Sequence, residues 1–473
     1  MDQAGFRVER DSLGEVSVPV GAYWGAQTAR AVQNFPISGV SLSHYPNLVR
    51  ALAMVKQAAA LANAALGKLA AEKARVIIAA AQEVIGGKLT DQFPIDVIQG
   101  GAGTSTNMNI NEVLANRGLE LLGRPRGDYA ALHPNDDVNM SQSTNDAYPS
   151  AVRVAILLST GGLRAALERL ATEFERKAAA FAHVLKLGRT QMQDAVPMTL
   201  GEELGAFAVT IREDMQRLSE VARLLHEINL GGTAIGTRIN ADPAYAPRAI
   251  AELASLSGFA LVQSANLVEA SWDMGAFVLF SGVLKRVATK LSKIGNDLRL
   301  LSSGPRGGFG EIQLPAVQPG SSIMPGKVNP VMPEVLTQVC FQVIGNDLAV
   351  TMAAEAGQLQ LNAFEPLIAH NIQESLMLLT NAVNSFTERC ASGIEAREEN
   401  CARHVEASVG IVTALVPAIG YERAAALAKE ALRSGRTVRE LARAEGLLPE
   451  AELDRLLDAR RLAEAGRLAQ ARR

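Results

Sequence analysis

The chain has 473 residues; 48% are hydrophobic, only 4% are aromatic, and the formal net charge is -3. A chain of this length can bury a large core and form two or three domains, and its small apolar side chains favour closely packed helices. The lack of a basic block argues against nucleic acid or an anionic membrane as the main partner.

Targeting and redox signals are weak along this chain. Residues 1–11 are charged throughout and do not provide the apolar core of a signal peptide. The longest apolar runs, such as residues 274–284, fall short of the ~20 residues that a membrane-spanning helix needs. Cys340, Cys390 and Cys401 lack metal-binding spacing, which is typical of reduced structural thiols. We therefore expect a soluble cytoplasmic protein without a disulfide framework, a zinc site or a membrane anchor.

Three regions follow one another along the chain. Residues 1–138 mix short helices with loops rich in glycine and asparagine, and residues 139–395 consist mainly of long amphipathic segments. Residues 396–473 contain two or three short helices separated by proline and glycine, with a final helix expected after Leu456. The sequence therefore predicts three domains with these bounds.

The middle region shows the clearest helical spacing. Leu163, Leu167, Leu170 and Phe174 recur every three or four residues, with charged residues between them. Apolar residues also repeat in near-heptad order from about residue 269 to 301. A helix of that length needs other helices to cover its apolar side. We predict a mainly α fold with a central bundle of long helices flanked by two smaller domains, and an oligomer that covers the remaining apolar faces.

Residues 303–333 interrupt the helical pattern, because they contain six glycines and six prolines. An irregular segment of this length in a compact domain is usually either functional or disordered. It carries the hydroxyls of Ser321 and Ser322, the ammonium of Lys327 and the amide of Asn329. This set is suited to holding a carboxylate while a nearby proton is removed, which predicts a mobile catalytic loop. A long surface turn is the alternative, since turns use the same residue types.

Five stretches of this chain resemble motifs of the fumarase/aspartase superfamily, in the family's order. They are residues 99–109, 133–139, 141–146, 188–191 and 320–330, with the sequences QGGAGTSTNMN, HPNDDVN, SQSTND, GRTQ and GSSIMPGKVNP. The resemblance implies the family's mainly α fold and a homotetramer whose pockets take motifs from three subunits. It also implies a small dicarboxylate substrate and an elimination that produces fumarate without a redox cofactor or a metal.

By this resemblance, Ser321 is the base that removes the proton from C3 of the substrate. A serine hydroxyl is normally too weak a base, so backbone N–H groups of the loop and nearby positive charge such as Lys327 must favour its alkoxide. Donors around the substrate must strengthen as an aci-carboxylate intermediate forms. The carboxylate beside the acidified carbon is assigned to Thr104, Ser143, Thr144 and Ser322, the other carboxylate to Lys327, Asn329 and Thr190, and the leaving group to Asn145.

The segment from Ser143 to Asp146 also has the composition of a helix N-cap, for a helix that we expect to enter after Pro149. The cap and the substrate site can occupy the same residues. Both interpretations are therefore kept.

Gln191 decides which leaving group we expect. Fumarases of this superfamily typically carry histidine at this place, where it partners a glutamate and helps handle a water molecule. This chain keeps a candidate partner in Glu334, and residues 193–198 (QDAVPM) resemble aspartate ammonia-lyases. A neutral amide accepts a hydrogen bond from an ammonium but does not transfer a proton as histidine does. We therefore expect reversible anti-elimination of ammonium from L-aspartate to give fumarate.

Three alternatives stay open. A class II fumarate hydratase, which interconverts fumarate and L-malate, is the first, and a lyase for another substituted aspartate is the second. A catalytically inactive structural member of the fold is the third, although such a protein would be expected to lose Ser321, Lys327 or Asn329. The chain also departs from the family's pattern at Arg238, where glycine is usual, and around Gly310, so altered specificity is possible.

Overall fold

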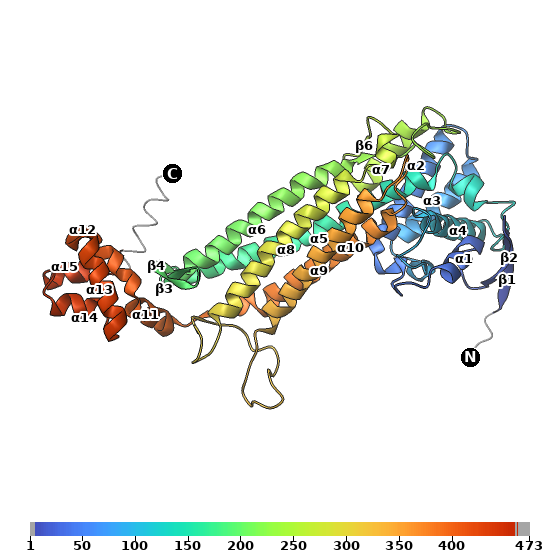
Figure 1. The fold of residues 1–473 in the computed structure, drawn as a ribbon. Coiled ribbons are helices and arrows are strands. Elements are labelled where there is room, and N and C mark those ends of the chain that lie inside the picture. Colours follow the sequence, from blue (N-terminus) through green and yellow to red (C-terminus); the bar gives the residue numbers. More distant parts are fainter. Residues whose placement is uncertain (1–4, 459–460, 462–473) are drawn as a thin grey trace. The chain divides into compact units, whose positions relative to one another are not determined.

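A computed structural model describes residues 5–458 and residue 461 (Figure 1). The chain forms two compact units, each built from three separate stretches of sequence. The first unit holds the described residues up to 164 together with residues 216–288 and 341–379, and the second holds residues 165–215 and 289–340 and the described residues from 380 onward. The three-domain division stays a prediction.

The fold is mainly α and contains a bundle of long helices, as predicted (Figure 1). Five helices contribute residues to both units. They are α5 (Thr144–Ala180), α6 (Leu200–Ala222), α8 (Gly275–Leu301), α9 (Val331–Glu355) and α10 (Glu365–Arg389).

Apolar side chains at helical spacing form the interior of this bundle. The four apolar residues of α5 singled out by their spacing, Leu163, Leu167, Leu170 and Phe174, are all 0% exposed. In α8, the near-heptad residues Val287, Leu291, Ile294, Leu298 and Leu301 are buried as well, whereas Val283, the first of the series, is half-buried. Burial of these side chains holds the helices together, because each removes apolar surface from water.

Two helices begin at other residues than the sequence indicated. α8 starts at Gly275, whose N–H donates to Asp273 Oδ2 at 3.2 Å, while Glu269–Ser271 form a separate 3-10 turn. α5 starts at Thr144, so Pro149 lies inside it. Proline has no N–H for the carbonyl of Asn145 four residues earlier, and Asn229 Nδ2 donates to that carbonyl instead at 2.9 Å. Local composition did not reveal this distant partner.

The remaining elements of the first unit include two helices, α2 and α4, most of whose residues are buried. β1 and β2 form an antiparallel hairpin that pairs Phe6 with Pro19, and β5 and β6 pair in parallel. The elements are β1 (Phe6–Asp11), β2 (Gly14–Pro19), α1 (Ala26–Asn34), η1 (Leu42–His44), α2 (Pro46–Ala65), α3 (Ala71–Ile85), η2 (Thr90–Gln92), α4 (Thr104–Leu121), η3 (Pro134–Val138), η4 (Arg223–His226), β5 (Glu227–Ile228), α7 (Tyr245–Ser257), β6 (Val262–Gln263) and η5 (Glu269–Ser271).

The second unit adds an antiparallel hairpin, a short strand pair and a cluster of short helices. Between α8 and α9, residues 302–330 are irregular except for β7, as the prolines and glycines predicted. The C-terminal region holds more short helices than expected, and the final helix predicted after Leu456 lies mostly outside the described residues. The elements are β3 (Leu185–Thr190), β4 (Gln193–Thr199), β7 (Ile312–Gln313), η6 (Ala391–Gly393), β8 (Glu395–Ala396), α11 (Glu398–Ala407), η7 (Val409–Leu415), α12 (Val416–Ile419), α13 (Tyr421–Ser434), α14 (Val438–Ala444) and α15 (Glu450–Leu456).

By length and composition alone, α5 and α9 could each cross a membrane, and so could residues 398–419 if that bent helix pair is one span. The most apolar windows of α5 and α9 are 67% and 39% buried inside the protein. Along α9, Asn346 donates to Glu374 at 2.8 Å, and Asp347 accepts from Ser281 at 2.8 Å. These polar contacts to α10 and α8 are typical of a helix packed among helices. The expectation that no segment enters a membrane stays a prediction.

All three cysteines are buried and unpaired. Burial raises the pKa of Cys340, Cys390 and Cys401 to about 12. Because the thiolate is the reactive form, these thiols are inert near neutral pH. The three cysteines are thus buried thiols, as a structural role requires, and the absence of a disulfide framework stays a prediction.

Candidate active site

The ten residues predicted for the site fall into two groups, one in each unit. The first unit holds Thr104, Ser143, Thr144 and Asn145, and the second holds Thr190, Gln191, Ser321, Ser322, Lys327 and Asn329.

Two helix starts bring the first group together. Thr104 is the first residue of α4 and Thr144 is the first residue of α5. A Cβ on Gly103 would lie 2.6 Å from the ring of Tyr148, so the α4 start packs directly against α5. Asn107 Nδ2 donates to Thr144 Oγ1 at 3.1 Å across the same junction. Two adjacent helix N-termini with exposed or half-buried hydroxyls favour an anionic ligand.

Asp146 fixes the loop before α5. Its Oδ1 accepts from Ser143 N at 2.9 Å while Ser143 Oγ accepts from Asn145 N at 3.2 Å, a reciprocal arrangement that confirms the predicted helix cap. Its Oδ2 accepts from the N–H groups of Gly231 and Thr233, both at 2.9 Å. Burial raises the pKa of Asp146 to about 6, although these backbone donors oppose the shift. One buried carboxyl group therefore ties the predicted site to the glycine-rich loop after β5.

Arg238, where the resemblance predicts glycine, lies in that same loop. Its φ of 62° is in the left-handed region that favours glycine, and its exposed guanidinium donates to Gln263 Oε1 at 3.0 Å. Asn145, predicted to face the leaving group, donates its amide to the carbonyl of Ala234 at 2.8 Å. The loop thus positions the Asn145 side chain.

The sequence analysis did not identify Lys56, whose hydrogen bonds fix side chains next to the first group of site residues. This residue of α2 is 0% exposed, and its ammonium donates to Asn107 Oδ1 at 2.6 Å, Gln142 Oε1 at 2.8 Å and Asn139 Oδ1 at 2.9 Å. Burial lowers its pKa to about 7, which the charge of Asp146 opposes. The available signal was a single lysine inside the apolar, alanine-rich run of residues 51–62.

In the second unit, Thr190 and Gln191 occupy the tip of the β3–β4 hairpin. Thr190 pairs with Gln193, so Gln191 and Met192 form a two-residue turn with φ values of 53° and 62°. Such a turn favours asparagine and glycine, because both central residues are left-handed. The backbone is therefore strained at Gln191, the residue predicted to contact the leaving group.

Glu311 anchors this hairpin. Its carboxylate is 0% exposed and accepts from Arg189 at 2.7 Å, while Lys186 Nζ lies at 3.1 Å and His404 Nδ1 at 2.9 Å. Burial works to raise the pKa of Glu311, but Lys186, His404 and Arg189 outweigh it and hold the pKa below its usual range. The hairpin, the start of the irregular segment and α11 thus share one buried carboxylate.

Gly310, next to this carboxylate, shows a local reason for its identity. Its φ is 54°, and a Cβ there would lie 2.9 Å from Asn400 Nδ2, which donates to the Gly310 carbonyl at 2.8 Å. The backbone conformation and the packing against α11 therefore both favour glycine at this position.

The loop from Gly320 to Asn329 closes on itself. Gly320 N donates to the carbonyl of Lys327 at 2.8 Å, and Asn329 Nδ2 donates to the carbonyl of Gly320 at 2.7 Å. A Cβ on Gly320 would lie 2.5 Å from the Lys327 carbonyl, so this close approach requires glycine. Asn329, which is predicted to bind substrate, therefore also joins the two ends of the loop.

Ser321 occupies an environment suited to a negative oxygen. Its Oγ accepts from two backbone N–H groups of the loop, Met324 N at 2.9 Å and Ile323 N at 3.2 Å. Ser322 and Lys327 are exposed on the same loop, and no carboxylate pairs with the Lys327 ammonium within the described part of the chain. Two fixed donors aimed at one oxygen stabilise charge that develops on it.

A hollow of about 730 Å³ lies under this loop. Lys327, Asn329 and Glu334 line it together with Arg299 and Arg397, two cations that sequence reasoning missed. The other predicted residues of the second unit, Thr190, Gln191, Ser321 and Ser322, do not line it. Lys327 and Asn329 thus share this hollow with two arginines and Glu334, whereas the predicted base lies outside its lining.

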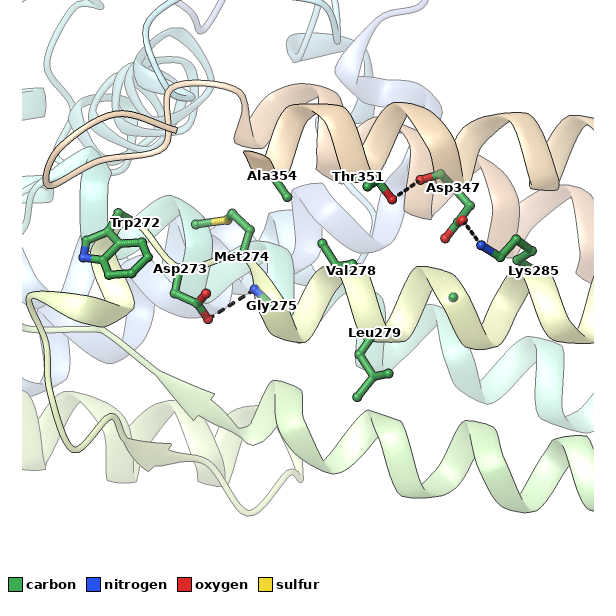
Figure 2. A pocket seen from close by; sticks show the side chains of 11 residues that line it. Trp272, Asp273, Met274, Gly275, Val278, Leu279, Lys285, Asp347, Thr351 and Ala354 are labelled. Carbon is green, nitrogen blue, oxygen red and sulfur yellow. Dashed lines mark hydrogen bonds and ion pairs between the residues drawn. The ribbon is translucent and has the colours of Figure 1, made fainter. Parts of the chain in front are cut away.

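Another hollow, of about 430 Å³, lies between α8 and α9 and contains none of the ten residues (Figure 2). Its lining includes Trp272, Asp273 and Met274, and at one end Lys285 Nζ pairs with Asp347 Oδ2 at 2.6 Å. Because that ammonium already has a carboxylate partner, the hollow is less suited to an anion than the loop pocket. Over residues 5–458 and 461, no group of three or more His, Cys, Asp or Glu is placed to hold a metal ion.

Comparisons with known proteins agree in sequence and in fold. The family described as "Lyase" matches residues 14–345, and the family described as "Fumarase C C-terminus" matches residues 411–464. An aspartate ammonia-lyase of Pseudomonas fluorescens is 61% identical over 96% of this chain and 95% of its own. A cobalt-bound structure titled fumarate lyase:delta crystallin, from Brucella melitensis, is 63% identical with a TM-score of 0.95, covering 97% of this chain and 100% of that one. A class II fumarase of Schistosoma mansoni is 35% identical with a TM-score of 0.92, covering 97% and 99%.

Proposed function

This chain belongs to the fumarase/aspartase superfamily, and from that premise we propose that it deaminates L-aspartate reversibly to fumarate and ammonium. The aspartate ammonia-lyase relatives, which match almost the whole chain, support this substrate. The observation that carries the chemistry is the pair of backbone N–H groups that donate to Ser321 Oγ. They supply the stabilisation that a serine alkoxide needs to act as a base.

In the proposed reaction, the Ser321 alkoxide removes the proton from C3 of L-aspartate. The electron pair of that C–H bond moves into the adjacent carboxylate and gives an aci-carboxylate. This intermediate collapses to fumarate as the C–N bond breaks and neutral ammonia leaves. Ammonia and the proton returned by the serine make ammonium, so atoms and charge balance. The ammonia can leave without a strong acid, because the amine is already protonated in the substrate.

Both groups of residues are required to hold the two carboxylates. The hydroxyls at the starts of α4 and α5 surround the carboxylate that gains charge, and Lys327, Asn329 and Thr190 hold the other. Gln191 accepts a hydrogen bond from the substrate ammonium. A glutamine cannot act as the proton-transferring partner that hydration favours, which supports deamination over the fumarase alternative.

We further propose a homotetramer whose active sites combine residues from three subunits. On α9, Phe341, Leu348 and Met352 are 61%, 62% and 65% exposed. Apolar side chains exposed in this number along one long helix mark a surface that another chain covers. An isolated protomer is then inactive, because it lacks the complete set of carboxylate ligands.

Fumarate absorbance tests the proposal directly. Purified protein is incubated with L-aspartate, with fumarate plus ammonium, and with fumarate alone. Change only with aspartate or ammonium supports deamination, and L-malate formed without ammonium assigns a hydratase instead. A folded oligomer that changes none of these refutes both activities and points to another substituted aspartate or to a structural role.

A further inference from the structure

The Thr144 hydroxyl has an unusual neighbour for a group expected to bind an anion. Asn107 Nδ2 donates to its oxygen at 3.1 Å. A hydroxyl group has one proton to donate, and that proton cannot point at an atom that is itself a donor. The direction of the Thr144 O–H bond therefore depends on which end of the Asn107 amide faces it.

Lys56 decides the orientation of that amide. Lys56 Nζ lies 2.6 Å from the other end of the Asn107 amide. In its protonated form the lysine is a donor with no acceptor, so that end of the amide must then be oxygen. Both residues are buried, at 0% and 1% exposure, so bulk water does not compete for these groups. The nitrogen of Asn107 is left to face Thr144.

A second set of contacts leads to the same orientation without reference to the lysine. Gln142 Nε2 faces the carbonyls of Val138 and Met140 at 3.1 and 3.2 Å, and Asn139 Nδ2 faces the carbonyl of Gln142 at 3.2 Å. The Asn139 oxygen is therefore turned inward, and it lies 3.1 Å from Asn107 Nδ2. A reversed Asn107 amide would set two oxygens against each other here. The network permits one arrangement of its amides.

Neighbouring hydroxyls give a useful contrast. Thr104 Oγ1 donates its proton to the carbonyl of Gly101 at 2.7 Å, so it must break this hydrogen bond before it can donate to a substrate. Thr144 has no such carbonyl partner among the described residues, and its proton is directed away from Asn107. Of the two threonines at the paired helix starts, Thr144 is the pre-directed donor.

We propose that Asn107 is a positioning residue that directs the Thr144 hydroxyl to donate to the substrate carboxylate on which negative charge develops. The inference rests on the proposed function, which gives Thr144 that carboxylate. A donor already oriented toward the developing charge needs no reorganisation during the reaction, so its effect falls mainly on kcat.

Asn107→Asp tests this with almost no change in size. The carboxylate still accepts from Lys56, but it now also accepts from Thr144 and turns the hydroxyl proton inward. We expect kcat for L-aspartate to fall about 10²- to 10³-fold, with KM changed less, as for loss of one donor to a developing anion. Thermal melting and oligomer size establish that the variant folds.

A double-mutant cycle separates positioning from a general effect of the added charge. In the Thr144→Val background there is no hydroxyl to redirect, so Asn107→Asp is expected to cause less than about a threefold further loss. Asn111→Asp is the matched control, because Asn111 also donates to Asn139, at 3.2 Å, but does not contact Thr144. It is expected to keep most of kcat.

Two results would overturn the inference. The first is an Asn107→Asp effect of the same size with and without the Thr144 hydroxyl. The second is a Thr144→Val variant with wild-type kcat, which decides the matter even if Asn107→Asp does not fold. The same cycle on the Kd for fumarate needs no turnover. If the wild-type protein binds fumarate but does not consume L-aspartate, the proposed function is refuted, and the mutant cycle on the fumarate Kd decides the inference. If the wild-type protein neither binds fumarate nor consumes L-aspartate, both the proposed function and the inference are refuted.

Discussion

Glu311→Gln removes a buried negative charge while keeping the shape of the side chain. Three cationic or polar partners surround the carboxylate, with Arg189 at 2.7 Å, His404 at 2.9 Å and Lys186 at 3.1 Å. Removing one partner of a buried ion pair typically costs about 3–5 kcal/mol, because the other charge is left buried without compensation. The variant should therefore destabilise the β3–β4 hairpin.

The structure indicates that the loss of stability in Glu311→Gln lies near the lower end of this range. Lys186 keeps a second carboxylate partner in Glu203 at 2.6 Å, and the Arg189 guanidinium stacks on the Phe309 ring at 4.1 Å. We expect a loss of about 3 kcal/mol in the free energy of unfolding at pH 7. The folded-state pKa of Glu311 is depressed, so the stabilisation is present above its ordinary pKa of 4.5 and is lost as pH falls through the folded value. The difference between wild type and variant should shrink below pH 4.5.

Hydrogen exchange in β3 and urea unfolding followed by circular dichroism measure the effect. Tryptophan fluorescence is unsuitable, because Trp24 and Trp272 both belong to the first unit. Glu398→Gln is the matched control, since its partner His183 lies at 3.3 Å in a pair that is more than 60% exposed on each side. Such an exposed pair contributes at most about 1 kcal/mol. Equal effects of the two substitutions would refute the argument that burial makes the Glu311 charge important.

Three further perturbations follow from the site. Ser321→Ala should lower kcat for L-aspartate by about 10²- to 10⁴-fold, because it removes the proposed base. The melting temperature should change little, because the two backbone N–H groups that lose their acceptor belong to exposed residues of the loop. Undiminished ammonia release by that variant would exclude the serine as base. Met192→Gly should stabilise the protein by about 1 kcal/mol, since the φ of 62° at this position strains any other residue. A lower melting temperature would show that the Met192 side chain contributes more than its backbone strain costs. Lys56 has a folded-state pKa of about 7, below the ordinary 10.5, so the unfolded chain binds more protons between these values and stability should rise with pH across that window. Lys56→Met should lose this rise in urea unfolding measured from pH 7 to 10, and an unchanged slope would assign the rise to other groups.

Much of the architecture could be predicted because the relevant interactions are local in sequence, whereas the roles of the site residues stay predictions. Apolar spacing predicted the buried side of α5, including Leu167 and Phe174, since a helix places every third or fourth residue on one face. The glycines and prolines predicted the irregular segment, because they exclude helical geometry in any fold. The helix cap at Ser143 could also be predicted from the sequence, because its donors and acceptors lie within three residues of one another.

The sequence by itself determined the mainly helical fold, the position of the irregular segment that carries Ser321, and the side chains available for chemistry. Only the tertiary structure decided how those side chains are directed. Asn229, which satisfies the carbonyl opposite Pro149, and Lys56, which orients Asn107, are distant in sequence from the groups that they contact. The left-handed backbone at Arg238 is likewise set by the fold around it. Hydrogen bonds between distant residues depend on the path of the whole chain, so no local pattern records them.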